Sequence, residues 1–303
     1  MHKQPGRGFT LIELMVVIAI IGLLTAIILP GARSLSRSAG TTVERSAARS
    51  MIGAWRSWSF DHAGRVLPGQ LEAGVPLPGS ESPMTWNGTP IPDIARRRWL
   101  WRLVSYLDDP VASLWVNDQR TFWENALANS TNQSEAVYLA TLHPSLGMNT
   151  DWLGGRQSDA CAVWALEQYI ASQDPGASPL RADTIASIRR PADLVAFASA
   201  RGRRNGDASA DVLEGYWRLN TPFAPSAQGP TPQWETTDTG NFVVPKAGTD
   251  PESVGGFLSP RHNGRVLVAA PDGHVGLESF EALGSMRRWA DPATEPHWAP
   301  SLP

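Results

Sequence analysis

The most distinctive chemistry in this sequence belongs to a carboxylate inside an apolar run. Glu13 is the one ionisable residue between Phe9 and Leu29, a stretch that also contains no proline. A carboxylate in hydrocarbon costs about 3 kcal/mol unless it is paired, so its position indicates a use. If the chain were cut after Gly8, a new amino terminus would form at Phe9, one helical turn from Glu13. The carboxylate of one subunit could then neutralise the Phe9 ammonium of a neighbour.

A second group of candidate residues lies near the C-terminus, where His262, Asp272 and His274 have side-chain types that zinc accepts. Residues 265–270 between them predict an extended strand, which places His262 roughly 25–35 Å from Asp272. Side chains that far apart cannot bind one ion unless the strand folds back. The structural interpretation is therefore favoured over a metal or catalytic site.

No other constellation predicts a reaction. The loop carboxylates lack the spacing of a calcium site, and these are Asp207, Asp211, Asp238 and Asp250. The sequence contains no G-x-S-x-G, no H-E-x-x-H and no phosphate-binding Gly-Lys-Ser/Thr motif. We therefore expect no metal, no cofactor, no catalytic residue and no enzymatic activity.

The element that must position Glu13 is a membrane-spanning helix over 9–29. At about 1.5 Å per residue this run covers roughly 30 Å, the thickness of the hydrocarbon core. Lys3 and Arg7 precede it, so the positive-inside rule predicts cytoplasmic residues 1–8 and a cap on the periplasmic or outer side. The run is too long for a cleaved signal peptide, and no small-x-small site follows it.

The residues from Gly8 to Leu24 resemble the N-terminus of type IV pilin and type II secretion pseudopilin precursors. They read Gly-Phe-Thr-Leu-Ile-Glu-Leu-Met-Val-Val-Ile-Ala-Ile-Ile-Gly-Leu-Leu, with Pro30 downstream. The resemblance implies that a prepilin peptidase cuts between Gly8 and Phe9 and methylates the Phe9 amine. It also implies that Glu13 guides docking into a helical filament. The alternative is a plain single-pass anchor with a stray glutamate.

Residues 30–60 predict an amphipathic extension of the same helix. Pro30 removes a backbone donor, so a kink is expected there. One stripe of the helix falls within an arc of about 120° and contains Val43, Ala47, Met51, Ala54, Trp55 and Trp58, opposite Arg45, Arg49 and Arg56. The resemblance implies an α+β, pilin-like fold: a long kinked helix, membrane-spanning in its first half, packed on a small antiparallel-sheet cap.

Residues 61–303 form the expected globular cap, with extra helices and long loops. The sequence predicts helices over 93–107, 122–128 and 160–171, with Asp93 as an N-cap. It predicts a strand over 194–198 and a long surface loop over 221–251, which is rich in proline.

The clearest signal in the cap is a hairpin over 262–277. Asp272-Gly273 lies between apolar runs, and both positions of such a turn favour positive φ. Asn263-Gly264 predicts a second turn at the other end of the strand. The string from His262 to Gly273 is similar to the H-X9-DG segment found near the C-terminus of many bacterial proteins that carry the same leader.

Composition limits the remaining possibilities. Hydrophobic residues make up 42% of the 303 residues, which is enough for a packed core. The net charge of −3 gives no support to nucleic acid as a partner. A single cysteine, Cys161, excludes an internal disulfide. The thirteen tryptophans indicate core packing, although a sugar-stacking surface is an alternative.

These observations predict a structural subunit of the inner membrane that joins a type II secretion pseudopilus or a type IV pilus-like filament. Its expected partners are a prepilin peptidase and other pilin or pseudopilin subunits, contacted through the 9–60 helix. The alternative is a membrane-tethered module that binds polysaccharide or another envelope ligand through its Trp-rich cap.

Overall fold

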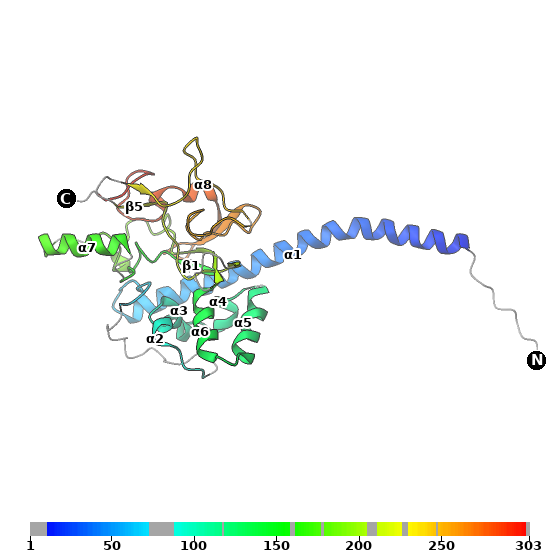
Figure 1. The fold of residues 1–303 in the computed structure, drawn as a ribbon, viewed down its shortest axis with the longest axis horizontal. Helices are drawn as coiled ribbons and strands as arrows, with labels where there is room; N and C mark the ends of the chain where they lie inside the picture. The colour runs from blue at the N-terminus through cyan, green and yellow to red at the C-terminus, as the bar shows by residue number, and fades with distance from the viewer. Residues whose placement is uncertain are drawn as a thin grey trace, which may run out of the picture. The chain divides into compact units, whose positions relative to one another are not determined.

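A computed structural model describes most of the chain. The described ranges are 11–72, 88–116, 118–157, 161–176, 179–204, 211–225, 230–246 and 248–300, without the side chains of residues 27–34, 36, 37 and 118. The chain divides into two compact units, Met1–Thr42 and Val43–Pro303. Helix α1 (Leu11–Asp61) is unbroken and contributes to both (Figure 1).

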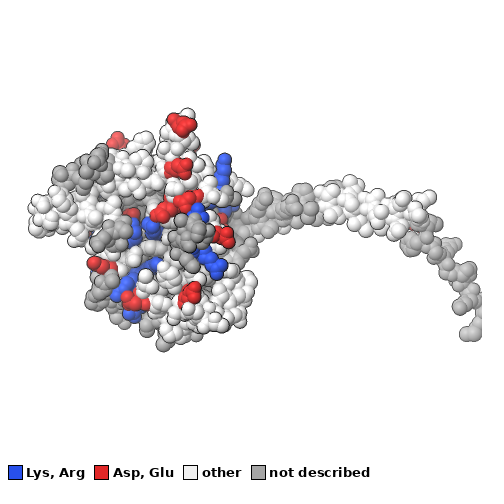
Figure 2. All heavy atoms as spheres, viewed as in Figure 1, with Lys and Arg blue, Asp and Glu red and all other residues white. Residues whose placement is uncertain are grey.

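In the first unit, the described apolar side chains of α1 are exposed. The large apolar side chains from Leu11 to Leu24 are 45% to 73% exposed, and the face seen in Figure 2 shows no charged residue there. Among the described residues, no helix combines the length and apolar character needed to cross a membrane. The predicted 9–29 span includes Phe9, Thr10 and the side chains of 27–29, which lie outside the described set. The side chain of Pro30 also lies outside the described set, so the kink expected there stays a prediction.

In the second unit, α1 is a central element of the core. The predicted stripe is confirmed for Ala47, Met51, Ala54, Trp55 and Trp58, all buried. Val43, at the edge of the stripe, is 49% exposed, which contradicts its expected burial. Figure 1 shows this half of α1 between the helices that follow it in the chain and the C-terminal strands. The helix ends as predicted, at a turn in which Ala63 and Gly64 have positive φ.

The main sheet has four antiparallel strands in the order β1-β2-β7-β8. They are β1 (Leu146–Met148), β2 (Phe197–Ser199), β7 (Arg265–Ala269) and β8 (Val275–Ser279). Two short antiparallel pairs flank it: β3 (Arg201–Arg203) with β4 (Val212–Glu214), and β5 (Phe223–Ala224) with β6 (Thr231–Pro232). The mixed α+β class and the antiparallel sheet are thus confirmed, as is the β7–β8 hairpin.

Seven further helices occur in the part of the chain that the structure describes. They are α2 (Asp93–Arg96), α3 (Trp99–Leu103), α4 (Pro110–Leu114), α5 (Asp118–Asn129), α6 (Gln133–Leu142), α7 (Ala162–Gln173) and α8 (Phe280–Leu283). Single 3-10 turns occur at η1 (Val104–Tyr106), η2 (Ile185–Ser187) and η4 (Met286–Arg288). The predicted helices at 122–128 and 160–171 correspond to α5 and α7.

The predicted helix over 93–107 is wrong in its continuity. It breaks at Arg97, whose carbonyl accepts the Leu71 N–H at 3.0 Å, and the Trp99 N–H donates to the Gly69 carbonyl at 3.0 Å. Gly69 and Leu71 thus form hydrogen bonds with backbone groups that a continuous helix would bond within itself. Asp93 is not the N-cap. It lies in the first turn, where its carboxylate pairs with Arg96 and Arg97.

Two other predictions need correction because contacts from elsewhere in the chain decide the conformation. The strand expected over 194–198 begins at Phe197, although the residues before it are buried. The segment 221–251 is not simply a surface loop. It contains β5 and β6, and the side chain of Trp234 is buried against Phe280, with ring centroids 5.2 Å apart.

Candidate functional site

The predicted assembly residue Glu13 lies in the first turn of α1, exposed among apolar side chains. The predicted cleavage and methylation residues, Gly8 and Phe9, lie outside the described residues.

The predicted Asn263-Gly264 turn is confirmed as a tight connection. The His262 N–H donates to the Arg265 carbonyl at 3.2 Å, and the Arg265 N–H donates back to the His262 carbonyl at 3.1 Å. Asn263 has φ of 54° and Gly264 has φ of 78°. Positive φ at both central positions is what a two-residue hairpin turn with type I′ geometry requires. Asparagine and glycine are the residues that tolerate it best.

The Asp272-Gly273 turn is confirmed as the hairpin connection, with a different geometry from the one expected. Gly273 alone has positive φ, at 100°. The turn is longer than two residues, because the Ala270 N–H donates to the His274 carbonyl at 2.8 Å. Asp272 acts through its side chain, whose Oδ1 accepts the His274 N–H at 2.8 Å. A side-chain acceptor thus replaces the left-handed backbone predicted for Asp272.

The two turns lie at opposite ends of β7, and each contacts α1. At one end, His262 Nε2 lies 3.0 Å from the Glu44 carboxylate. At the other, Arg56 Nη1 donates to the Asp272 carbonyl at 3.0 Å. His262 and Asp272 therefore attach to positions twelve residues apart on α1 rather than meeting at one site. The H-X9-DG segment fastens the hairpin to the helix.

The strongest of these attachments centres on Glu44, which is fully buried. Arg261 binds its carboxylate with two nitrogens, Nη2 at 2.6 Å and Nε at 2.9 Å. The Ser199 hydroxyl donates to the same carboxylate at 2.6 Å. Arg261 also donates through Nη1 to Glu214 at 2.7 Å and through Nη2 to the Ser145 carbonyl at 2.8 Å. The helix, the strand β2 and the turn before β7 thus share one network.

Electrostatics keep this network ionised. Burial alone would favour the protonated form of Glu44, but the Arg261 charge and the hydrogen bonds from His262 and Arg261 outweigh it and lower the pKa of Glu44 to about 2. Burial opposes the charge of Arg261 as well, and the carboxylates of Glu44 and Glu214 raise its pKa above the ordinary value. A paired, hydrogen-bonded geometry is the condition under which buried charges are tolerated.

Glu44 was not identified from the sequence, although a signal was present. At about 100° per residue, Glu44 lies between Met51 and Trp55, inside the apolar arc. A carboxylate in that position must be buried with a partner or must break the stripe. Its partner Arg261 is more than two hundred residues away, so the pairing itself had no local sequence signal.

The described tryptophans pack in or against the core, as the composition indicates. Of the described tryptophans, ten are buried, namely Trp55, Trp58, Trp99, Trp101, Trp115, Trp123, Trp152, Trp217, Trp234 and Trp289. Trp164 and Trp298 are partly buried against the same core. These side chains therefore do not form an open stacking surface for sugars. Charged residues of both signs are interspersed on the cap face seen in Figure 2.

Comparisons with known proteins identify the N-terminal region. A model of the prokaryotic N-terminal methylation motif matches residues 5–29. The chain is 35% identical over 89 residues to the type II secretion system core protein G of Pseudomonas aeruginosa. That match covers 29% of this chain and 63% of the relative, which is less than two thirds of the relative's length. No solved structure matches the chain.

The chain therefore carries the N-terminal methylation motif of prepilin-type chains. It is also distantly homologous to the type II secretion system core protein G, a pseudopilin. The resemblance to pilin and pseudopilin precursors is therefore confirmed for the N-terminal motif and, as a distant homology, for core protein G.

Proposed function

We propose that this chain is a structural subunit that is cut after Gly8, methylated at the Phe9 amine and assembled into a type II secretion pseudopilus or a related filament. The observation that carries the proposal is the methylation motif over 5–29. The distant homology to core protein G points the same way. The role is mechanical rather than enzymatic.

The exposed apolar half of α1 supports an assembly role. Eleven large apolar side chains between Leu11 and Leu24 are at least 45% exposed. An apolar surface of that extent requires cover from lipid or from other chains. In this proposal, residues 9–29 lie in the inner membrane before assembly, with residues 1–8 cytoplasmic and the cap periplasmic. After assembly they pack against the same segment of neighbouring subunits.

Glu13 gives the assembly a register. The residue stands one helical turn from Phe9, so its carboxylate can neutralise the Phe9 ammonium of an adjacent subunit. Pairing offsets the cost of placing either charge in an apolar filament core. A shifted register leaves both charges unpaired and is therefore disfavoured.

Mass spectrometry of the mature protein tests the processing step. The expected product begins at Phe9 and carries one methyl group on its amine. A protein that keeps Met1, or one cut at another position, contradicts the proposal.

Assembly of Glu13→Ala subunits tests the register. Cleavage after Gly8 should be unaffected, because the peptidase acts before docking, whereas filament yield should fall sharply. Glu281→Ala removes an exposed glutamate of the cap and serves as the matched control. Normal filaments from Glu13→Ala would refute the pairing with Phe9.

A further inference from the structure

The two edges of the main sheet differ in what lies beside them. On the outer side of β1, the Met148 N–H donates to the Trp217 carbonyl at 3.2 Å, and the Leu219 N–H donates to the Met148 carbonyl at 2.9 Å. The outer side of β8 pairs with no strand and no bridge of the described residues. The edge at β8 is therefore open in the part of the chain that the structure describes.

The register of the β7–β8 hairpin decides which groups of β8 point outward. The Ala270 N–H donates to the His274 carbonyl, and hydrogen-bonded and non-bonded pairs alternate along an antiparallel ladder. The N–H and C=O groups of Val275, Leu277 and Ser279 therefore point away from β7. The N–H groups of Val275 and Leu277 form no hydrogen bond with any residue that the structure describes.

Strand β8 lacks the features that usually keep an edge strand from pairing. Its sequence, Val-Gly-Leu-Glu-Ser, contains no lysine and no proline, and its five residues pair with β7 without a bulge. Residues 276–278 are half-buried, and Ser279 is exposed. The side chain of Arg265 reaches the edge and donates to the outward-pointing Leu277 carbonyl. An edge of this kind can accept an added extended chain.

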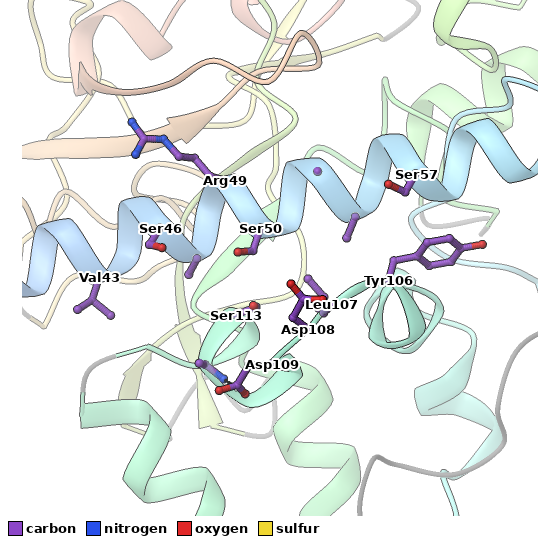
Figure 3. A pocket seen from close by; sticks show the side chains of 14 residues that line it. Val43, Ser46, Arg49, Ser50, Ser57, Tyr106, Leu107, Asp108, Asp109 and Ser113 are labelled. Atoms are coloured by element: carbon purple, nitrogen blue, oxygen red, sulfur yellow. Dashed lines mark hydrogen bonds between the residues drawn. The ribbon is translucent and has the colours of Figure 1, made fainter.

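Three arginines form a row on one side of α1. They are Arg45, Arg49 and Arg56, called the arginine row below. At about 100° per residue they fall within an arc of about 40°. Figure 3 shows the guanidinium of Arg49 on the side of α1 opposite Asp108 and Asp109, the two acids of a groove of about 510 Å³. The arginine row is therefore turned away from these carboxylates.

The arginine row lies beside the hairpin on its β8 side. Arg56 Nη1 donates at 3.0 Å to the carbonyl of Asp272, in the turn that leads into β8. Glu44 is about 120° away from the row on α1, and it accepts a hydrogen bond from Ser199 of β2. Because β2 and β8 lie on opposite sides of β7, the arginine row faces the β8 edge.

The charges of the arginine row have no carboxylate partner among the described residues. Arg56 binds a carbonyl, and Arg45 Nε is buried with no hydrogen-bond partner there. The acid of β8 itself, Glu278, is already paired with Arg288 at 3.1 Å. Guanidinium groups held without a counter-charge favour an acidic partner.

We propose that the outer edge of β8 and the arginine row bind an extended acidic segment of a partner protein. The backbone of the segment pairs with Val275 and Leu277 and adds a strand to the sheet. Alternate side chains of a strand lie about 7 Å apart on one face, and Arg45 and Arg49 are about 6 Å apart along α1. Acids at every second position of the segment therefore meet the row. Arg265 releases the Leu277 carbonyl and binds a carboxylate instead. The inference does not depend on filament assembly.

Binding of synthetic peptides to the full-length chain in detergent micelles tests the contact. The probe is a labelled peptide of about eight residues in which glutamate and threonine alternate, and fluorescence anisotropy follows its binding. A peptide with lysine in place of glutamate should bind at least about tenfold more weakly. Two further peptides are N-methylated, one at every glutamate and one at every threonine. Because successive N–H groups of a strand point to opposite edges, one of these should lose at least about tenfold in affinity and the other should bind as before.

Substitutions in the chain give the matched controls. Arg49→Glu should weaken binding of the glutamate peptide by at least about tenfold. Arg65→Glu makes the same charge change at an exposed arginine beyond the end of α1 and should leave the affinity unchanged. Leu277→Pro removes an N–H that points away from β7, so it should block strand addition and keep the β7–β8 ladder. In the unsubstituted chain, hydrogen exchange at the Val275 and Leu277 amides should slow by at least about tenfold when the glutamate peptide is added.

Each alternative has its own result. Equal binding of the two methylated peptides, or binding without protection of the Val275 and Leu277 amides, overturns strand addition. Affinity that Arg49→Glu leaves unchanged overturns the arginine row as the acid-binding element. Protection of the same amides in concentrated protein without peptide shows a second copy at the edge and overturns the choice of occupant. Absence of binding by the glutamate peptide overturns the proposal as a whole.

Discussion

The buried Glu44–Arg261 pair makes a quantitative prediction about stability and pH. Glu44→Gln keeps the size of the side chain but removes the charge that Arg261 binds at 2.6 and 2.9 Å. Breaking a buried pair by removing one partner costs about 3–5 kcal/mol. The fall in the pKa of Glu44 from its ordinary 4.5 to about 2 corresponds to about 3 kcal/mol. Because Arg261 keeps Glu214 as a second partner, we expect the lower end of that range, about 3 kcal/mol, at pH 7.

The pH dependence follows from the direction of the shift. A carboxyl whose folded pKa is depressed stabilises the fold above its unfolded pKa, and this stabilisation is lost as the pH falls toward the folded pKa. The difference in unfolding free energy between wild type and Glu44→Gln should therefore be full above pH 4.5 and shrink between pH 4.5 and about 2.

Urea unfolding of the full-length chain in detergent micelles measures both effects through the fluorescence of the buried tryptophans. Glu214→Gln is the matched control. The Glu214 side chain is 49% exposed, so its loss should cost at most about 1 kcal/mol. A Glu44→Gln variant within about 1 kcal/mol of wild type at pH 7, or a difference that stays constant through pH 3, would refute the reasoning.

Three further predictions test the core, the cysteine and a glycine of α1. Trp234→Ala should lower the unfolding free energy by about 3–5 kcal/mol, since it empties a buried site against Phe280; a change under about 1 kcal/mol in urea unfolding would contradict its burial. Cys161 is buried, and its pKa is raised to about 12, chiefly by burial. An aromatic disulfide reagent at pH 8 should therefore modify this thiol only in urea. Rapid labelling of the folded chain would contradict this. Gly53→Ala should stabilise the isolated chain by about 0.5–1 kcal/mol in the same unfolding assay, because the added Cβ meets open space; destabilisation would show that the site is closed.

Local patterns in the sequence predicted the elements whose determinants are local. The buried stripe of α1 follows from helical period, and the 263–264 turn follows from the backbone freedom of asparagine and glycine. The hairpin at β7–β8 follows from apolar runs on either side of Asp272-Gly273. In each case the deciding residues are within a few positions of one another.

Features decided by distant contacts were not predictable in this way. The break at Arg97 depends on hydrogen bonds from residues 69–71. The burial of Trp234 depends on α8, and the carboxylate of Glu44 depends on Arg261. A single sequence shows the buried member of each pair only as an anomaly, such as an acid within an apolar stripe. The proposed processing residues Gly8 and Phe9 are the reverse case, because the proposal for them rests on the sequence motif alone.

The two attachments at the ends of β7 bear on how load would be carried in the filament that we propose. Glu44 and Arg56 are twelve residues apart on α1, about 18 Å along the helix axis, and each contacts a residue at one end of the same strand. A pull along α1 would therefore reach the hairpin through two separate contacts rather than through one. In the proposed filament subunit, the H-X9-DG segment would hold the hairpin to α1 at both positions under load.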